Sequence, residues 1–137
     1  MYNANTMKRF LYAIAFFLLV SCAGNNGSDV RVITDFYKAV LGETEMTDAL
    51  LQESLSQEVL SSLWEADYDD TYSWWNFRTG YQDGPSDVST LDGIESLGQG
   101  WYRVSYTDMG TQGSTDVKLE GGKITDYRPF RKAEEVE

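Results

Sequence analysis

The sequence contains no histidine and only one cysteine. Without histidine, the Ser-His-Asp and Cys-His arrangements of nucleophilic enzymes cannot form. Zinc and copper sites are also unexpected, because these metals prefer histidine nitrogen and cysteine sulfur as ligands. A single thiol cannot close an intramolecular disulfide. We therefore expect no cofactor, no transition-metal centre and no disulfide framework. Calcium, which takes oxygen ligands alone, stays a candidate.

Cations are also scarce, with 11 lysines and arginines against 22 acids. Two of these cations, Lys8 and Arg9, precede the first acid. From Cys22 onward nine cations face 22 acids, a net charge of −13. Such a surface repels polyanions, so we expect no nucleic-acid partner. It also repels anionic lipid headgroups, so membrane contact should come through an anchor.

The longest apolar run is short, covering the eleven residues 10–20. As a helix it would rise about 16 Å, too little to cross a ~30 Å hydrocarbon core. Lys8 and Arg9 before it and the small residues after it give the layout of a secretory signal peptide. We predict a signal peptide over residues 1–21, with Met7 as the expected true start.

The lone cysteine stands two positions after this run. The sequence Leu19-Val20-Ser21-Cys22 resembles the bacterial lipobox, in which the cysteine is acylated and becomes the mature N-terminus. The alternative is ordinary cleavage after Ala23. We predict lipidation at Cys22, residues 22–28 as lipidated cysteine plus flexible tether, and a membrane partner reached through this lipid. Because Ala23, and not Asp, follows the cysteine, the expected location in the cell envelope is the outer membrane.

Residues 29–65 carry helical patterns. Ser28 or Asp29 can cap a helix over 29–41 and Gly42 can end it. Apolar residues recur there at helical spacing: Val30, Ile33, Phe36, Tyr37, Val40 and Leu41. Thr47 and Ser56 can cap segments 47–53 and 57–65, which form one broken helix or two short ones. The second segment carries Val59, Leu60, Leu63 and Trp64 on one face.

The remainder reads as strands. Residues 87–98 predict a strand interrupted at Gly93, and residues 100–109 alternate with Tyr102, Val104 and Tyr106 on one face. Residues 110–114 are expected to form a turn. Two further strands over 115–128 are joined by Gly121-Gly122, which suits a two-residue hairpin turn, with Val117, Leu119 and Ile124 facing the core. We predict one α+β domain over 29–132, with helices on one face of a curved antiparallel sheet of about four strands, and a tail over 133–137.

Four segments carry a resemblance: "ITDFYKAVL", "DYDDTYSWWNFRTGYQD", "GWYRVSY" and "VKLEGGKITDYRP". Together they span about residues 29–130. The chain resembles small exported lipoproteins of Gram-negative bacteria that carry a cystatin-like domain of unknown function, of the nuclear-transport-factor-two type. The resemblance implies a cone-like fold and transfers no catalytic residue. Enzymes of the related superfamily use an Asp and a Tyr in the cone's cavity, for which Asp126, Tyr102, Tyr106 and Tyr127 are candidates.

Two further clusters are candidate sites. Asp67, Asp69 and Asp70 offer oxygen ligands for a weak calcium site, although Tyr72 stands where the helix-loop-helix calcium pattern needs glycine. A solvated acidic loop is the alternative. Six aromatics lie within residues 68–81, and the candidate ligand contacts there are Tyr72, Trp74, Trp75, Arg78 and Tyr81. The alternative role of this segment is to plug the open end of the cone.

We therefore predict a lipid-anchored cell-envelope protein that serves as a small binding or accessory module. Its ligand would be a small molecule, a glycan or a protein. The alternatives are a periplasmic isomerase or hydrolase, and a partner-binding or inhibitory protein. An enzyme would need a closed, roomy cavity with a perturbed Asp or Glu, so the space between helix 29–41 and the sheet would have to be empty of side chains.

Overall fold

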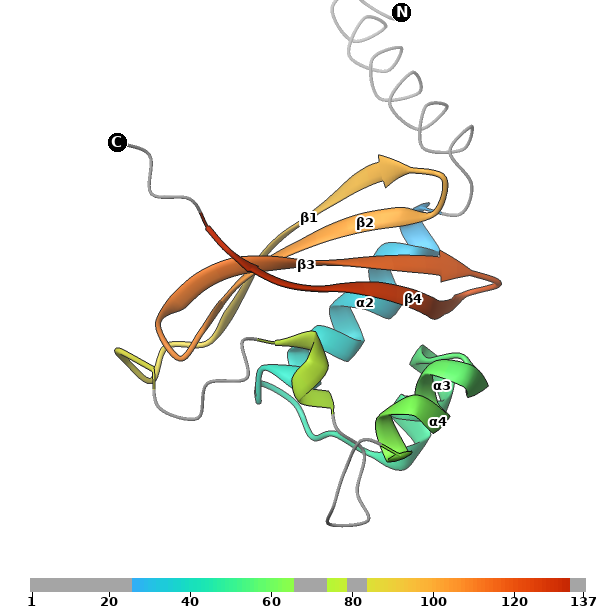
Figure 1. Ribbon diagram of the computed structural model, residues 1–137, viewed down its shortest axis with the longest axis horizontal. Helices are drawn as coiled ribbons and strands as arrows, with labels where there is room; N and C mark the ends of the chain where they lie inside the picture. Colours follow the sequence, from blue (N-terminus) through green and yellow to red (C-terminus); the bar gives the residue numbers. More distant parts are fainter. Residues whose placement is uncertain (1–25, 66–73, 79–83, 134–137) are drawn as a thin grey trace, which may run out of the picture.

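A computed structural model describes residues 26–65, 74–78 and 84–133. Four helical segments precede four strands (Figure 1): α2 (Asn26–Val40), α3 (Asp48–Ser54), α4 (Gln57–Glu65), η1 (Trp74–Phe77), β1 (Thr90–Gly98), β2 (Trp101–Asp108), β3 (Thr111–Glu120) and β4 (Lys123–Lys132). The strands form one antiparallel sheet in the order β1-β2-β3-β4. This confirms the predicted α+β class. In the described part of the chain, no helix is both long and apolar enough to cross a membrane.

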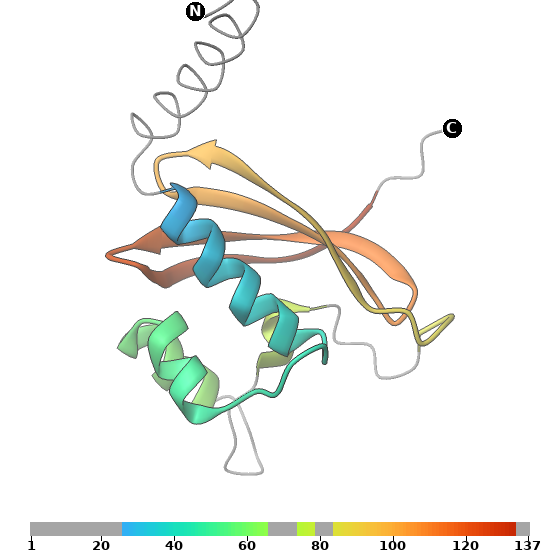
Figure 2. The same cartoon turned by 180° about the vertical axis from the view of Figure 1, so that it is seen from behind.

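Helix α2 lies across one face of the sheet, as Figure 2 shows from behind. It begins at Asn26, three residues earlier than predicted, so Ser28 and Asp29 belong to its first turn. The Tyr102 hydroxyl lies 2.5 Å from Asn26 Oδ1 and 2.8 Å from Asp29 Oδ2, and its single proton is shared between these two acceptors. These bonds tie the first turn of the helix to the start of β2. The predicted end is confirmed, since Gly42 adopts φ +85°.

The region from Thr47 to Glu65 forms two short helices. Thr47 Oγ1 accepts from the Leu50 N–H at 3.1 Å, and Ser56 Oγ accepts from the Val59 N–H at 3.3 Å, as N-caps do. Between the helices Leu55 is extended and bridges to Ile124, whose carbonyl accepts from the Ser56 N–H at 2.9 Å. The break therefore attaches the helical pair to β4.

Trp64 and Val30 depart from their predicted positions. Each is exposed, although the helical spacing placed it with core residues. Both stand at the margin of their helix's apolar face, where the side chains of Leu63 and Ile33 take the buried position. A periodic pattern does not distinguish the centre of such a face from its margin.

The hairpin turns are two residues long where β2 meets β3 and where β3 meets β4. Gly121 and Gly122 adopt φ +59° and +78°, which confirms the predicted glycine turn. The prediction of a turn over 110–114 is wrong, because the chain reverses at Met109-Gly110 and β3 already begins at Thr111. Both turn residues have positive φ, +49° and +82°, so two residues suffice to close the hairpin. The predicted irregularity at Gly93 is present as a register shift in β1.

The core fills the space between the helices and the sheet. Ile33, Phe36, Tyr37 and Val40 of α2 form one cluster with the inward residues of the strands: Tyr102, Val104, Tyr106, Val117, Leu119 and Ile124. The predicted inward faces of the last three strands are therefore confirmed. Phe77 of η1 completes this cluster, edge-on to Phe36 at 4.9 Å between ring centroids.

Candidate functional site

The interior between α2 and the sheet is packed with side chains in the part of the chain that the structure describes. Tyr102 and Tyr106 are buried there, and burial is the main cause that raises the pKa of each phenol well above its ordinary value. Tyr106 shares a 2.6 Å hydrogen bond with the Thr115 hydroxyl. Asp126 is exposed instead, so it shares no cavity with these two tyrosines.

Most of the candidate residues in the middle segment and at the N-terminus lie outside the described residues. These are Cys22, Asp67, Asp69, Asp70, Tyr72 and Tyr81. Trp74 and Trp75 belong to η1, but their side chains are also outside the description. Phe77 is fully buried against Phe36 and Tyr127, which agrees with the plug role for this part of the segment.

Arg78 contacts the protein itself. Its Nε donates to Asp108 Oδ2 at 2.9 Å, its Nη2 pairs with Asp108 Oδ1, and its Nη1 donates to the Val40 carbonyl at 3.0 Å. The Asp108 side chain is wholly buried and the Arg78 side chain nearly so. Arg78 therefore joins the end of α2, the chain after η1 and the end of β2, a role that fixes structure.

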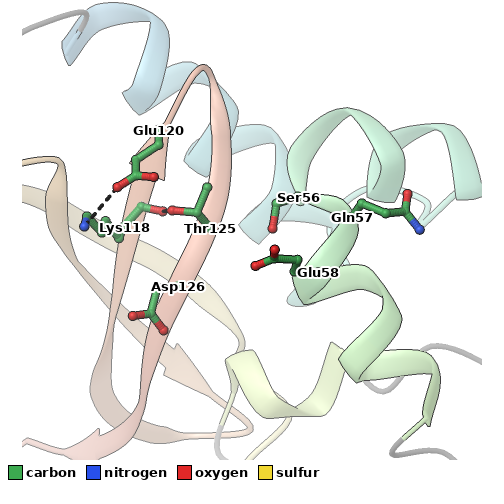
Figure 3. Close-up of a pocket in the computed structure, with 7 residues that line it drawn as sticks. All are labelled: Ser56, Gln57, Glu58, Lys118, Glu120, Thr125 and Asp126. Atoms are coloured by element: carbon green, nitrogen blue, oxygen red, sulfur yellow. Dashed lines mark hydrogen bonds and ion pairs between the residues drawn. The ribbon is translucent and has the colours of Figure 1, made fainter.

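A polar hollow of about 500 Å³ lies between the start of α4 and the β3–β4 hairpin (Figure 3). Lys118 Nζ pairs there with Glu120 Oε1 at 2.9 Å. The hollow is lined by Ser56, Gln57, Glu58, Lys118, Glu120, Thr125 and Asp126. Among the described residues, no group of three or more acidic, histidine or cysteine side chains is arranged to hold a metal ion. The hollow is open, and its acids offer no convergent ligand set.

A different cluster occupies the outer face of the sheet, the face away from α2. Because Tyr102 and Val104 point into the core, Arg103 between them points outward. On β3, Asp116 lies outward between the buried Thr115 and Val117. The register pairs Arg103 with Asp116 and Asp116 with Arg128 across three strands. Of the described helices, none covers this face in either view (Figures 1 and 2).

Three guanidinium groups converge on the Asp116 carboxylate. Arg103 donates through Nε to Oδ1 at 3.0 Å and through Nη2 to Oδ2 at 3.3 Å. Arg131 Nη2 donates to the same Oδ2 at 3.1 Å, and Arg128 Nη1 lies 3.7 Å from it. The Asp116 side chain is only 1% exposed, whereas those of Arg128 and Arg131 are each 58% exposed. We call Arg103, Asp116, Arg128 and Arg131 the arginine cluster.

The electrostatics of the arginine cluster favour a further anion. Three guanidinium groups face the Asp116 carboxylate and Glu95, which the register places opposite Arg103, so the surroundings of Asp116 carry a local excess of one positive charge. The hydrogen bonding that Arg103 donates to Asp116 is the main cause that raises the pKa of Arg103. The Arg128 guanidinium stacks 4.2 Å above the Trp101 ring, which orients it. Arginine forks of this kind bind carboxylate, phosphate or sulfate groups.

Charge is distributed unevenly over the fold. Residues 26–65, which form α2, α3 and α4, carry eight acids and two cations. Residues 101–132, which form β2, β3 and β4, carry six cations and four acids. Residues 26–65 thus carry a net charge of −6, whereas the four-stranded sheet is neutral, because Asp92 and Glu95 of β1 offset the two excess cations of β2–β4.

Sequence reasoning missed the arginine cluster. Its members come from three strands, at positions 103, 116, 128 and 131, and the strands meet only through pairing. The signal that could have found them is the outward position of Arg103 between two inward aromatic and aliphatic residues. The Gly121-Gly122 hairpin brings Asp116 near Arg128, but the pairing of Asp116 with Arg103 also needs the Met109-Gly110 turn, which the sequence did not indicate.

Compared with known proteins, the chain matches no family model, no curated protein and no solved structure. The candidate site therefore rests on its own geometry.

Proposed function

We propose that this protein is an exported, lipid-anchored binding module of the cell envelope, held in the outer membrane through Cys22, whose recognition surface is the outer face of the sheet. The arginine cluster binds an anionic group of the ligand there. One observation carries this proposal: three guanidinium groups converge on a single buried carboxylate, on a face that none of the described helices covers.

The geometry of the cluster is more than cross-strand pairing requires. The side chains of Arg128 and Arg131 are each 58% exposed, so their contacts with the buried Asp116 carboxylate leave guanidinium donors free to bind a further anion. Asp116 fixes Arg103 in a bidentate contact, and Trp101 orients Arg128. Groups held in place in this way lose less conformational entropy when they bind a ligand.

The ligand that suits this surface is an acidic saccharide. A densely charged polyanion would be repelled by a chain with 22 acids against nine cations from Cys22 onward. A saccharide with single carboxylates spaced along neutral rings meets the cluster without that penalty. Its carboxylates match the planar guanidinium fork.

The finer fold type belongs to the same proposal. A long helix packed across a twisted four-stranded meander agrees with the cone-like, cystatin or nuclear-transport-factor-two type and with the resemblance to exported lipoproteins. The catalytic alternative would need a cavity between α2 and the sheet. Side chains of the described residues fill that space.

A binding measurement with trigalacturonate tests the proposal. We expect the wild type to bind trigalacturonate and to ignore its methyl ester, which has the same sugar without the charge. The Arg128→Gln/Arg131→Gln double variant should weaken binding about tenfold or more, because each charge-assisted hydrogen bond contributes about 1.5 to 3 kcal/mol before solvent screening.

The matched control removes the same charge elsewhere. Arg31→Gln/Lys38→Gln lies on α2, so it changes net charge equally and should leave the affinity within about twofold at 0.15 M salt, where the Debye length is about 8 Å. Equal losses in both double variants, or equal binding of acid and ester, would sink the proposal.

A further inference from the structure

One end of the fold brings together the first turn of α2 and the turn between β1 and β2. The Tyr102 hydroxyl, one residue into β2, bonds to both Asn26 and Asp29. Figures 1 and 2 both show the start of α2 beside this turn. The β2–β3 turn, with Val88 next to it through the Gly110 N–H to Val88 carbonyl bond of 2.8 Å, lies at the opposite end.

The tether to the lipid is short if Cys22 is acylated. Only three residues, 23–25, separate Cys22 from the first residue of α2. Four steps of about 3.8 Å between successive Cα atoms reach about 15 Å at most. The headgroup layer on each side of a bilayer is itself about 5 to 8 Å thick. The end of the fold that starts α2 therefore has to lie at the membrane surface.

The chemistry of that end suits a lipid interface. Residues 96–101 carry no charge, and the turn residues Gln99 and Gly100 have positive φ, as does Gly98 at the end of β1. Leu97 immediately precedes the turn and is 39% exposed. Val30, in the first turns of α2, is a second exposed aliphatic residue at this end. An uncharged turn beside an exposed leucine enters a headgroup layer without the repulsion that the acidic helical surface would meet.

We propose that the β1–β2 turn and the first turn of α2 form a membrane-docking end, which inserts Leu97 into the headgroup region of the bilayer that holds the lipid anchor. This inference rests on the lipidation in the proposed function. In this orientation the strands extend away from the membrane surface, and the outer face of the sheet faces parallel to the membrane plane. Docking also makes the acidic helical side and the arginine cluster point in different lateral directions.

A site-directed spin-label experiment tests this orientation. The acylated Cys22 is the only native cysteine, so a cysteine introduced elsewhere takes the label alone. Mature Leu97→Cys and Val88→Cys lipoproteins are each reconstituted into phosphatidylcholine vesicles. Val88 is the matched control, being an aliphatic residue that is 55% exposed at the opposite end. Gln99→Cys repeats the test within the turn.

We expect the labels at 97 and 99 to be reached by oxygen in preference to a water-soluble nickel complex, and the label at 88 to show the reverse. If the vesicles float with the protein but 97 and 99 behave like 88, the docking end is wrong while the anchor stands. If the mature protein does not float with vesicles, the anchor fails and the docking end fails with it. Flotation and label accessibility thus separate the two proposals.

Discussion

Asp116 is the residue on which the outer face depends. Its carboxylate is 1% exposed, yet it lies on the face that no described helix covers, because the arginines themselves shield it from water. A buried acid of this kind is tolerated only when charged donors surround it. Here the donors are side chains that remain exposed, so one acid both stabilises the sheet and positions a cationic surface.

Replacing Asp116 by Asn should therefore lower the free energy of unfolding by about 2 kcal/mol, since the guanidinium groups lose their only shared anion and a buried polar group loses charge-assisted bonds. Urea denaturation followed by far-ultraviolet circular dichroism measures this change. Asp126→Asn is the matched control, because Asp126 is exposed on the neighbouring strand, and it should stay within about 0.5 kcal/mol of the wild type. Identical midpoints for both variants would contradict the role given to Asp116.

At the scale of elements, local sequence was sufficient where the signal was local. The helix over α2, the caps at Thr47 and Ser56 and the Gly121-Gly122 hairpin all follow from residues a few positions apart. The start of α2 was misplaced because it depends on Tyr102, 76 residues from Asn26. The β2–β3 turn was misplaced because Met109 adopts positive φ. Positive φ is uncommon for a residue other than glycine, so the residue type gives no sign of the turn.

The arginine cluster is the clearest case of what local sequence leaves open. Each arginine alone resembles an ordinary solvated cation. Only the register that pairs Arg103 with Asp116 and Asp116 with Arg128 turns them into one site. A shift of one residue in that register would send Asp116 to the core and abolish the cluster.

The register itself depends on the glycine turn between β3 and β4. Gly122→Val should lower the free energy of unfolding by about 1 to 2 kcal/mol, because a β-branched residue is strained at φ +78° even though open space surrounds the position. Gly27→Ala is the control, since Gly27 is helical and has equally open surroundings, and it should be neutral or slightly stabilising. Thermal unfolding of both variants checks this. A neutral Gly122→Val would mean that the turn does not set the register.

At the scale of the whole molecule, charged and uncharged surfaces lie on different sides of the fold. Acids dominate the helical side, cations gather on the outer face of the sheet, and the uncharged β1–β2 turn lies beside the start of α2. A lipid at Cys22 would orient the fold relative to the membrane. The start of α2 would lie at the membrane surface, and the arginine cluster would face parallel to the membrane plane. The packed interior agrees with recognition on a surface.

The proposed location and orientation of the protein both depend on lipidation at Cys22. The mass of the mature N-terminal peptide tests this lipidation most directly. We expect a peptide that begins at Cys22 and carries the added mass of a diacylglyceryl group. A peptide that begins at Gly24 without lipid, as cleavage after Ala23 would produce, would contradict it.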